Sequence, residues 1–179
     1  MIVKKILSLA ASIIKLLIIT SVFSINCNAV AENIKYYSED NGILSLMYHR
    51  FDENKYPSTN IKMNIFKEQI KIIKKLNIKF YDPGQLDKNF NIPKDNKKIL
   101  LTVDDAFSSF YDVAWPYLKK NKIPFILFVS TEPIGKKGYM SWKQIKEIEK
   151  ESYAYIGNHA HTHDYLVDLN YKDFSNRIV

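Results

Sequence analysis

Two stretches of this chain carry residue types that could bind a metal ion or move protons. Asp104 and Asp105 are adjacent carboxylates at the end of an apolar run, and residues 159–163 hold three histidines at alternate positions. Neighbouring carboxylates repel each other unless a cation or a proton relieves them. Because carboxylates and neutral imidazoles are common ligands of divalent transition metals, the two stretches together predict a metal site.

The spacing of the histidines leaves two arrangements open. In an extended segment, His159, His161 and His163 would all face the same side. On a loop that turns into a helix, His159 and His163 would share one face and His161 would point away. A histidine-rich loop with no ligand role is the simpler alternative, and the carboxylate pair makes the metal site the better interpretation.

The elements around these stretches indicate an α/β domain. The apolar run before Asp104 has the composition of a buried strand, so both carboxylates are expected at its carboxyl end, where α/β sheets and barrels bind ligands. Strands and helices alternate, which predicts parallel strands with right-handed crossovers. The predicted strands are 43–48, 78–81, 99–103, 123–129 and 153–156, and the predicted helices are 64–77, 108–121 and one from 141 through 148.

Local signals set the expected ends of these elements. Asn64 is the expected N-cap of the first helix, and Pro116 either kinks the second helix or marks a second start. Ser141 and Gln144 form the expected capping box of the third helix. The continuous apolar run 123–129 is typical of a strand that is buried on both faces.

The front of the chain has the features of an export signal. Two lysines precede a largely apolar stretch, which ends in an Ala-Val-Ala sequence of the kind that a signal peptidase cuts. We expect a signal peptide at 1–31, a lead-in at 32–42, and export to the periplasm or the extracellular space. The alternative is an uncleaved membrane anchor, since the apolar stretch approaches the ~20 residues that span a bilayer. The single cysteine, Cys27, lies in the predicted leader, so no disulfide is expected in the mature chain.

Composition fits one globular domain and argues against some classes of partner. The chain has 179 residues, of which 46% are hydrophobic and 25% charged. Its net charge of +7 falls to +4 without the three lysines of the leader, and no basic motif with interleaved aromatic residues occurs, so no nucleic-acid binding is expected. Membrane contact is expected only through the signal or anchor segment, and no obligate protein partner is predicted.

The two stretches resemble the first two motifs of the NodB-homology polysaccharide deacetylases, carbohydrate esterase family four. Residues 102–105 resemble the aspartate motif and residues 159–163 the histidine motif. The flanking sequence is similar to that of this family as well. The supporting segments are 46–49, 123–125, 139–142 and 156–158, and the resemblance extends over about 43–169.

This resemblance implies a distorted (β/α) barrel that removes acetyl groups from N-acetylated sugars. It implies that Asp105, His159 and His163 bind a divalent transition metal, with zinc as the first choice, and that Asp104 is the general base. The metal would polarise the amide carbonyl and activate water, and the adjacent unligated carboxylate could accept the proton of that water. His161 would be left in outer contact with the site. The implied partner is an N-acetylated glycan at the cell surface or outside the cell.

The chain departs from the pattern of this family in two respects. Ala106 stands where the family usually has glycine, which would cost strain if that position needs a positive φ. The later motifs of the family, which supply an arginine beside the base, aromatic residues of the groove and a histidine acid, have no counterpart here, and no element is predicted after residue 169. The domain 43–179 is therefore expected to be incomplete, truncated at its C-terminus. His49 is the first candidate for the missing acid.

Two other functions compete with a deacetylase. A catalytically inactive, truncated homologue could retain metal or carbohydrate binding alone. A metal-dependent phosphoesterase would also use aspartates and histidines, but it usually needs ligands for two metals, and the chain has only four histidines.

Overall fold

The computed structural model describes residues 42–85 and 97–177, which all belong to one compact unit. The predicted signal peptide at 1–31 and its alternative as an anchor lie outside the described residues, as does the lead-in up to residue 41. Over the described ranges, every helix is too short or too polar to cross a bilayer.

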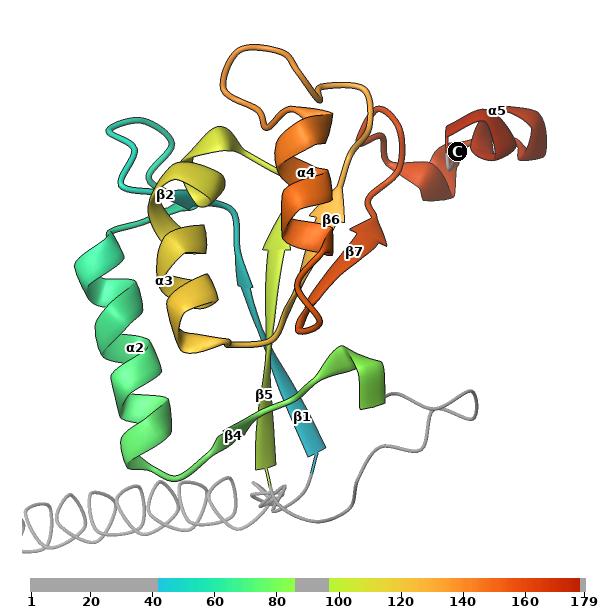
Figure 1. Ribbon diagram of the computed structural model, residues 1–179. Helices are drawn as coiled ribbons and strands as arrows, with labels where there is room; N and C mark the ends of the chain where they lie inside the picture. Colours follow the sequence, from blue (N-terminus) through green and yellow to red (C-terminus); the bar gives the residue numbers. More distant parts are fainter. Residues whose placement is uncertain (1–41, 86–96, 178–179) are drawn as a thin grey trace, which may run out of the picture. The chain divides into compact units, whose positions relative to one another are not determined.

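A parallel sheet forms the centre of this unit (Figure 1). Its strands run in the order β1-β5-β6-β7, and the short β4 pairs with the first half of β5. A separate parallel pair, β2 with β3, follows β1. The bounds are β1 Gly42–Tyr48, β2 Arg50–Phe51, β3 Asn60–Ile61, β4 Lys79–Phe80, β5 Lys97–Asp104, β6 Phe125–Val129 and β7 Ala154–Asn158. The predicted α/β arrangement with parallel strands is confirmed.

The strand register brings the carboxyl ends of four strands to the same edge of the sheet. Tyr48 of β1 pairs with Val103 of β5, and Asp104 pairs with Phe128 of β6. Phe128 in turn pairs with Gly157 of β7, where a Cβ atom would lie only 2.5 Å from the Phe128 ring, so glycine allows the close approach. The loops that follow these strands therefore start side by side.

Three helices cover one face of the sheet (Figure 1). They are α2 (Met63–Lys75), α3 (Trp115–Asn121) and α4 (Trp142–Glu149). Shorter turns connect the elements: the 3₁₀ turns η1 (Pro83–Gln85) and η3 (Leu166–Asp168), and the π-helical turn η2 (Phe110–Ala114) directly before α3. A last helix, α5 (Tyr171–Arg177), follows η3.

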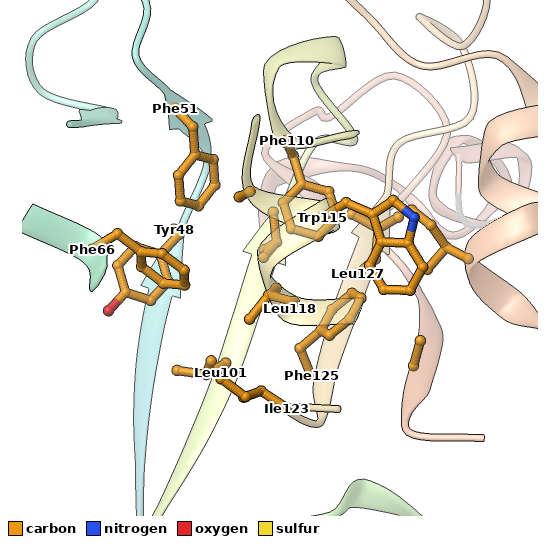
Figure 2. Packing of buried hydrophobic residues seen from close by; sticks show 14 of the residues in the cluster. Tyr48, Phe51, Phe66, Leu101, Phe110, Trp115, Leu118, Ile123, Phe125 and Leu127 are labelled. Carbon is orange, nitrogen blue, oxygen red and sulfur yellow. The ribbon is translucent and has the colours of Figure 1, made fainter. Parts of the chain in front are cut away.

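The core lies between this helical layer and the sheet (Figure 2). Edge-to-face aromatic contacts join its parts: the Phe66 ring lies 5.0 Å from Tyr48 and 5.2 Å from Phe51, and Phe125 lies 5.4 Å from Phe110. On β6, however, buried residues alternate with half-buried ones. The prediction that 123–129 is buried on both faces is therefore wrong, because the described helices cover only one face of this strand.

Two predictions about the helices need correction, one at the start of α2 and one after residue 169. Asn64 is not the N-cap of α2, which starts at Met63, and the carboxylate of Asp52 accepts the hydrogen bond of the Met63 amide at 2.9 Å. A side chain distant in sequence thus does the capping. The chain also forms α5 after residue 169, where no element was predicted, and Asn170 accepts a hydrogen bond from the Asp173 amide at 3.0 Å in its first turn.

Two other boundary predictions are confirmed. Pro116 lies in the first turn of α3 and follows the π-helical turn, so it marks a second start and not a kink within one helix. The capping box of α4 is present: Ser141 Oγ accepts from the Gln144 amide at 3.3 Å, and Gln144 Oε1 accepts from the Ser141 amide at 2.7 Å.

Candidate metal centre

The two aspartates lie at the carboxyl end of β5 in different backbone conformations. Asp104 is the last residue of the strand, whereas Asp105 and Ala106 have left-handed φ values of 71° and 55°. This conformation is costly for residues other than glycine, so the strain expected at Ala106 is present. The turn is held by the neighbouring loop, because the Met140 amide donates to the Ala106 carbonyl and the Ser108 amide donates to the Gly138 carbonyl, both at 2.9 Å.

The histidine segment leaves β7 as a loop. Its start is tied to β6 by a hydrogen bond from the His159 amide to the Val129 carbonyl at 3.0 Å. Ala160 and His163 have left-handed φ values of 62° and 58°, which fold the segment back on itself. The rings of His159 and His163 consequently lie edge to face, with centroids 4.7 Å apart.

His161 points away from the other two histidines. Its Nδ1 atom lies 2.8 Å from the Thr131 hydroxyl oxygen, and its backbone amide donates to the Arg177 carbonyl at 2.6 Å. Of the two arrangements that the sequence left open, the structure therefore has the one in which His159 and His163 share a side and His161 points away. The segment that follows β7 is a loop and not the start of a helix.

Asp105 and the paired histidines converge on one point in space. Asp105 Oδ1 lies 3.5 Å from His159 Nε2 and 3.5 Å from His163 Nε2, and all three candidate ligand atoms lie within 4.8 Å of one another. The His163 side chain is 60% exposed, so the cluster is open to solvent on one side. One carboxylate and two imidazoles with an open position fit a divalent transition metal ion of the kind used in hydrolysis.

Asp104 lies beside this cluster in a drier environment. The residue is 7% exposed, and its Oδ1 atom has no hydrogen-bond partner among the described residues. Burial raises the pKa of the Asp104 carboxyl and the Asp105 carboxylate adds to this rise, while positive charge at His159, His49 and His163 opposes it. A buried carboxylate oxygen without a partner is rare in folded proteins and is typical of a functional group.

Two hollows lie next to these residues. One of about 270 Å³ is formed by the histidine loop, including His159 and His163. The other, of about 350 Å³, lies at the carboxyl end of β1. It is lined by Met47, Tyr48, His49, Ser58, Thr59, Asn60, Ile61 and Gln69. His49 thus lines the second hollow and is also one of the residues whose charge affects the pKa of Asp104.

Some residues around the cluster were not predicted from the sequence. Thr131, which contacts His161, follows the carboxyl end of β6, so the rule that directed attention to Asp104 could have found it. Arg50 packs on the ring of Phe107, two positions after Asp105. Arg177 contacts the histidine loop. No sequence signal indicated these last two contacts, because they join segments far apart in the chain.

The fold and the cluster together define an α/β protein with a candidate hydrolytic metal centre at the carboxyl ends of its strands. Residues 91–179 match the family model described as polysaccharide deacetylase. This match supports the polysaccharide deacetylase domain that the resemblance of the motifs implied.

Curated proteins that are similar to this chain are named as deacetylases as well. The chain is 27% identical over 152 residues to the poly-beta-1,6-N-acetyl-D-glucosamine N-deacetylase of Staphylococcus aureus, a match that covers 73% of this chain and 51% of that protein. The chain thus spans about half the length of the curated relatives it matches.

Solved structures confirm the expected fold. IcaB from Ammonifex degensii is 29% identical, with a TM-score of 0.60, and the match covers 74% of this chain and 57% of that one. The Streptococcus pyogenes deacetylase PplD, solved in complex with acetate, is 24% identical and shares the fold with a TM-score of 0.63 over 76% of this chain and 64% of its own.

Proposed function

We propose that this protein is an exported, metal-dependent hydrolase that removes N-acetyl groups from a β-1,6-linked poly-N-acetylglucosamine. The observation that carries the proposal is the convergence of Asp105, His159 and His163, whose ligand atoms lie within 4.8 Å, beside the buried carboxylate of Asp104. The glycan is taken from the activity named for the Staphylococcus relatives. Export rests on the leader predicted at 1–31.

The three clustered residues would hold the metal ion, for which we propose zinc. A divalent ion bound there supplies Lewis acidity toward an amide carbonyl and toward water. Imidazole nitrogens with a single carboxylate suit zinc, cobalt, nickel or iron better than magnesium, which prefers oxygen ligands. His161 is not part of this ligand set, since its ring is turned toward Thr131.

Asp104 would act as the general base. Its unpartnered Oδ1 atom can accept the proton that water loses as its oxygen bonds to the acetyl carbon. The charges at His159 and His49 support the ionised form that this role needs, against the opposing effect of burial. The pKa of the Asp104 carboxyl, raised by burial, makes its carboxylate a stronger proton acceptor than a solvent-exposed aspartate.

His49 is the residue we propose as the general acid. It follows the carboxyl end of β1, lines the hollow of about 350 Å³, and is close enough to Asp104 to affect its pKa. When the carbon–nitrogen bond breaks, a protonated His49 could donate its proton to the departing amine, so that acetate and a free amino sugar are formed.

The test is acetate release by the full chain from a β-1,6-linked N-acetylglucosamine pentamer and, as a matched control, from a β-1,4-linked pentamer. We expect release from the first that stops with a chelator and returns with zinc. His49→Ala should lower the rate by ~10²–10⁴-fold without loss of metal, as expected for a missing acid. A metal-loaded chain that releases no acetate would instead indicate an inactive homologue that only binds metal or glycan.

A further inference from the structure

Arg50 is the first residue of β2 and lies between two aromatic rings. Its guanidinium carbon is 3.4 Å from the centre of the Phe107 ring and 4.4 Å from the centre of the Tyr56 ring. The Arg50 side chain is only 15% exposed. A planar guanidinium stacks on aromatic faces in a way that a lysine ammonium does not, so this arrangement, which we call the Arg50 sandwich, depends on arginine.

The charge of Arg50 is neutralised within the protein. Its Nη1 atom lies 3.0 and 3.3 Å from the two carboxylate oxygens of Glu53. Glu53 also accepts a hydrogen bond from the Ser109 hydroxyl at 2.7 Å, and Ser109 Oγ accepts from the Phe51 amide at 3.2 Å. The β2 segment therefore contacts the chain after β5 at two points, Phe107 and Ser109.

These two points follow directly after the strained turn that carries Asp105. The other side of the turn is held by residues 138–140, through the hydrogen bonds at Ala106 and Ser108 and through the Tyr139 ring, 4.9 Å from Phe107. The Phe107 ring thus has Arg50 and Tyr139 as neighbours. Left-handed conformations at residues other than glycine persist only where the surroundings hold them, and contacts from both sides meet that need.

We propose that Arg50 is a positioning residue for the metal centre: the Arg50 sandwich fixes Phe107, and through it the turn that directs the Asp105 carboxylate toward His159 and His163. This inference rests on the metal site of the proposed function but not on the reaction or the glycan. Without the sandwich, the turn can relax and move Asp105 Oδ1, while the two histidines on their separate loop keep their positions.

The test uses the full chain loaded with cobalt(II), whose visible absorption reports the geometry of its ligands. Arg50→Met should weaken cobalt affinity at least tenfold and change the absorption band, and Arg50→Lys should not restore either, because lysine keeps the charge without the planar contact. Lys119→Met is the matched control, since it removes a cation 5.6 Å from the Trp115 ring and an ion pair with Glu151, in contacts that involve none of the cluster residues. We expect it to lower the melting temperature slightly and leave the cobalt spectrum unchanged.

The outcomes separate the sandwich from the metal site itself. A folded Arg50→Met variant with an unchanged spectrum and an affinity within twofold of the wild type would overturn the proposal. If Arg50→Met does not fold, Phe107→Leu takes its place, because it removes the stacked ring but keeps the Arg50–Glu53 pair, and the same spectral change is expected. A wild-type chain that binds no cobalt would overturn the metal site and the role of Arg50 with it.

Discussion

Asp104 and Asp105 are neighbours in sequence, yet their surroundings give them different chemistry. Asp104 continues the extended conformation of β5 and remains buried, whereas the positive φ of Asp105 directs its carboxylate toward two imidazoles. The carboxylate with imidazole neighbours is suited to bind a cation. The Asp104 carboxylate, whose buried Oδ1 atom has no hydrogen-bond partner among the described residues, is suited to accept a proton.

The different orientations of the three histidines lead to the first prediction. His159→Ala and His163→Ala should each weaken zinc binding by more than about 100-fold, beyond the cost of losing a group that only orients a ligand. His161→Ala removes a contact to Thr131 and no candidate ligand, so it should cost less than about tenfold. Zinc affinity measured by competition with a chromogenic chelator checks this. Equal losses for His161→Ala and His163→Ala would favour the extended arrangement.

The environment of Asp104 predicts how the stability of the metal-free protein depends on pH. Because burial raises its folded-state pKa, the folded protein binds the proton more tightly than the unfolded chain, and stability is lost as pH rises from the unfolded pKa through the folded one. The asparagine of Asp104→Asn cannot ionise, so this variant does not lose stability in this way as the pH rises. The variant should therefore melt at a higher temperature than the wild type at neutral pH in chelator, with a difference that disappears in acid. A difference that does not vary with pH would show that ionisation of Asp104 is not its cause.

At the scale of elements, apolar runs in the sequence were enough to predict the strands of the five-stranded sheet and to place Asp104, Asp105 and the histidines after strand ends. The short pair of β2 and β3 was not predicted, because it lies in a segment whose sequence is typical of a polar loop. The pairing of the histidines could not be chosen, because it depends on left-handed conformations at Ala160 and His163, which no glycine marks. The cap of α2 could not be found either. Its acceptor, Asp52, comes from another segment and has a left-handed conformation of its own.

The last helix supports the histidine loop and leads to a prediction for α5. Arg177 accepts the His161 amide hydrogen bond through its carbonyl, and its side chain donates to the Thr162 hydroxyl at 3.0 Å and lies 3.3 Å from Asp164. Arg177→Ala should remove only the side-chain contacts. Zinc affinity should fall by less than the ~10–100-fold expected for a group bonded directly to a ligand. Faster proteolysis between 160 and 170 should accompany this loss, and unchanged proteolysis would contradict a supporting role for α5.

At the scale of the whole described unit, the sheet is open. No described strand pairs with β1 on its outer edge, and β1 carries the exposed side chains of Leu44 and Met47. An edge strand with exposed apolar side chains can pair with another copy of the chain. The described unit therefore has one edge that favours self-association.

A single charge on this edge should reduce that association. Leu44, which is 61% exposed, can be changed to lysine without loss of core packing, and lysine is a common means of blocking edge strands. Ile65→Lys makes the same kind of change at an exposed position of α2 and is the matched control. Light scattering at increasing concentration should show less association for Leu44→Lys only. An equal effect of both variants would mean that net charge, and not the β1 edge, controls association.

The measurement that tests the central claim most directly compares Asp104→Asn with Asp105→Asn for metal content and acetate release in the same preparations. We predict that Asp104→Asn keeps one metal ion per chain while acetate release falls by ~10²–10⁴-fold, because only the proton acceptor is lost. Asp105→Asn should lose both the metal and the activity, because it removes the only carboxylate of the cluster. Equal loss of metal in the two variants, or full activity in Asp104→Asn, would contradict the division of roles between these neighbours.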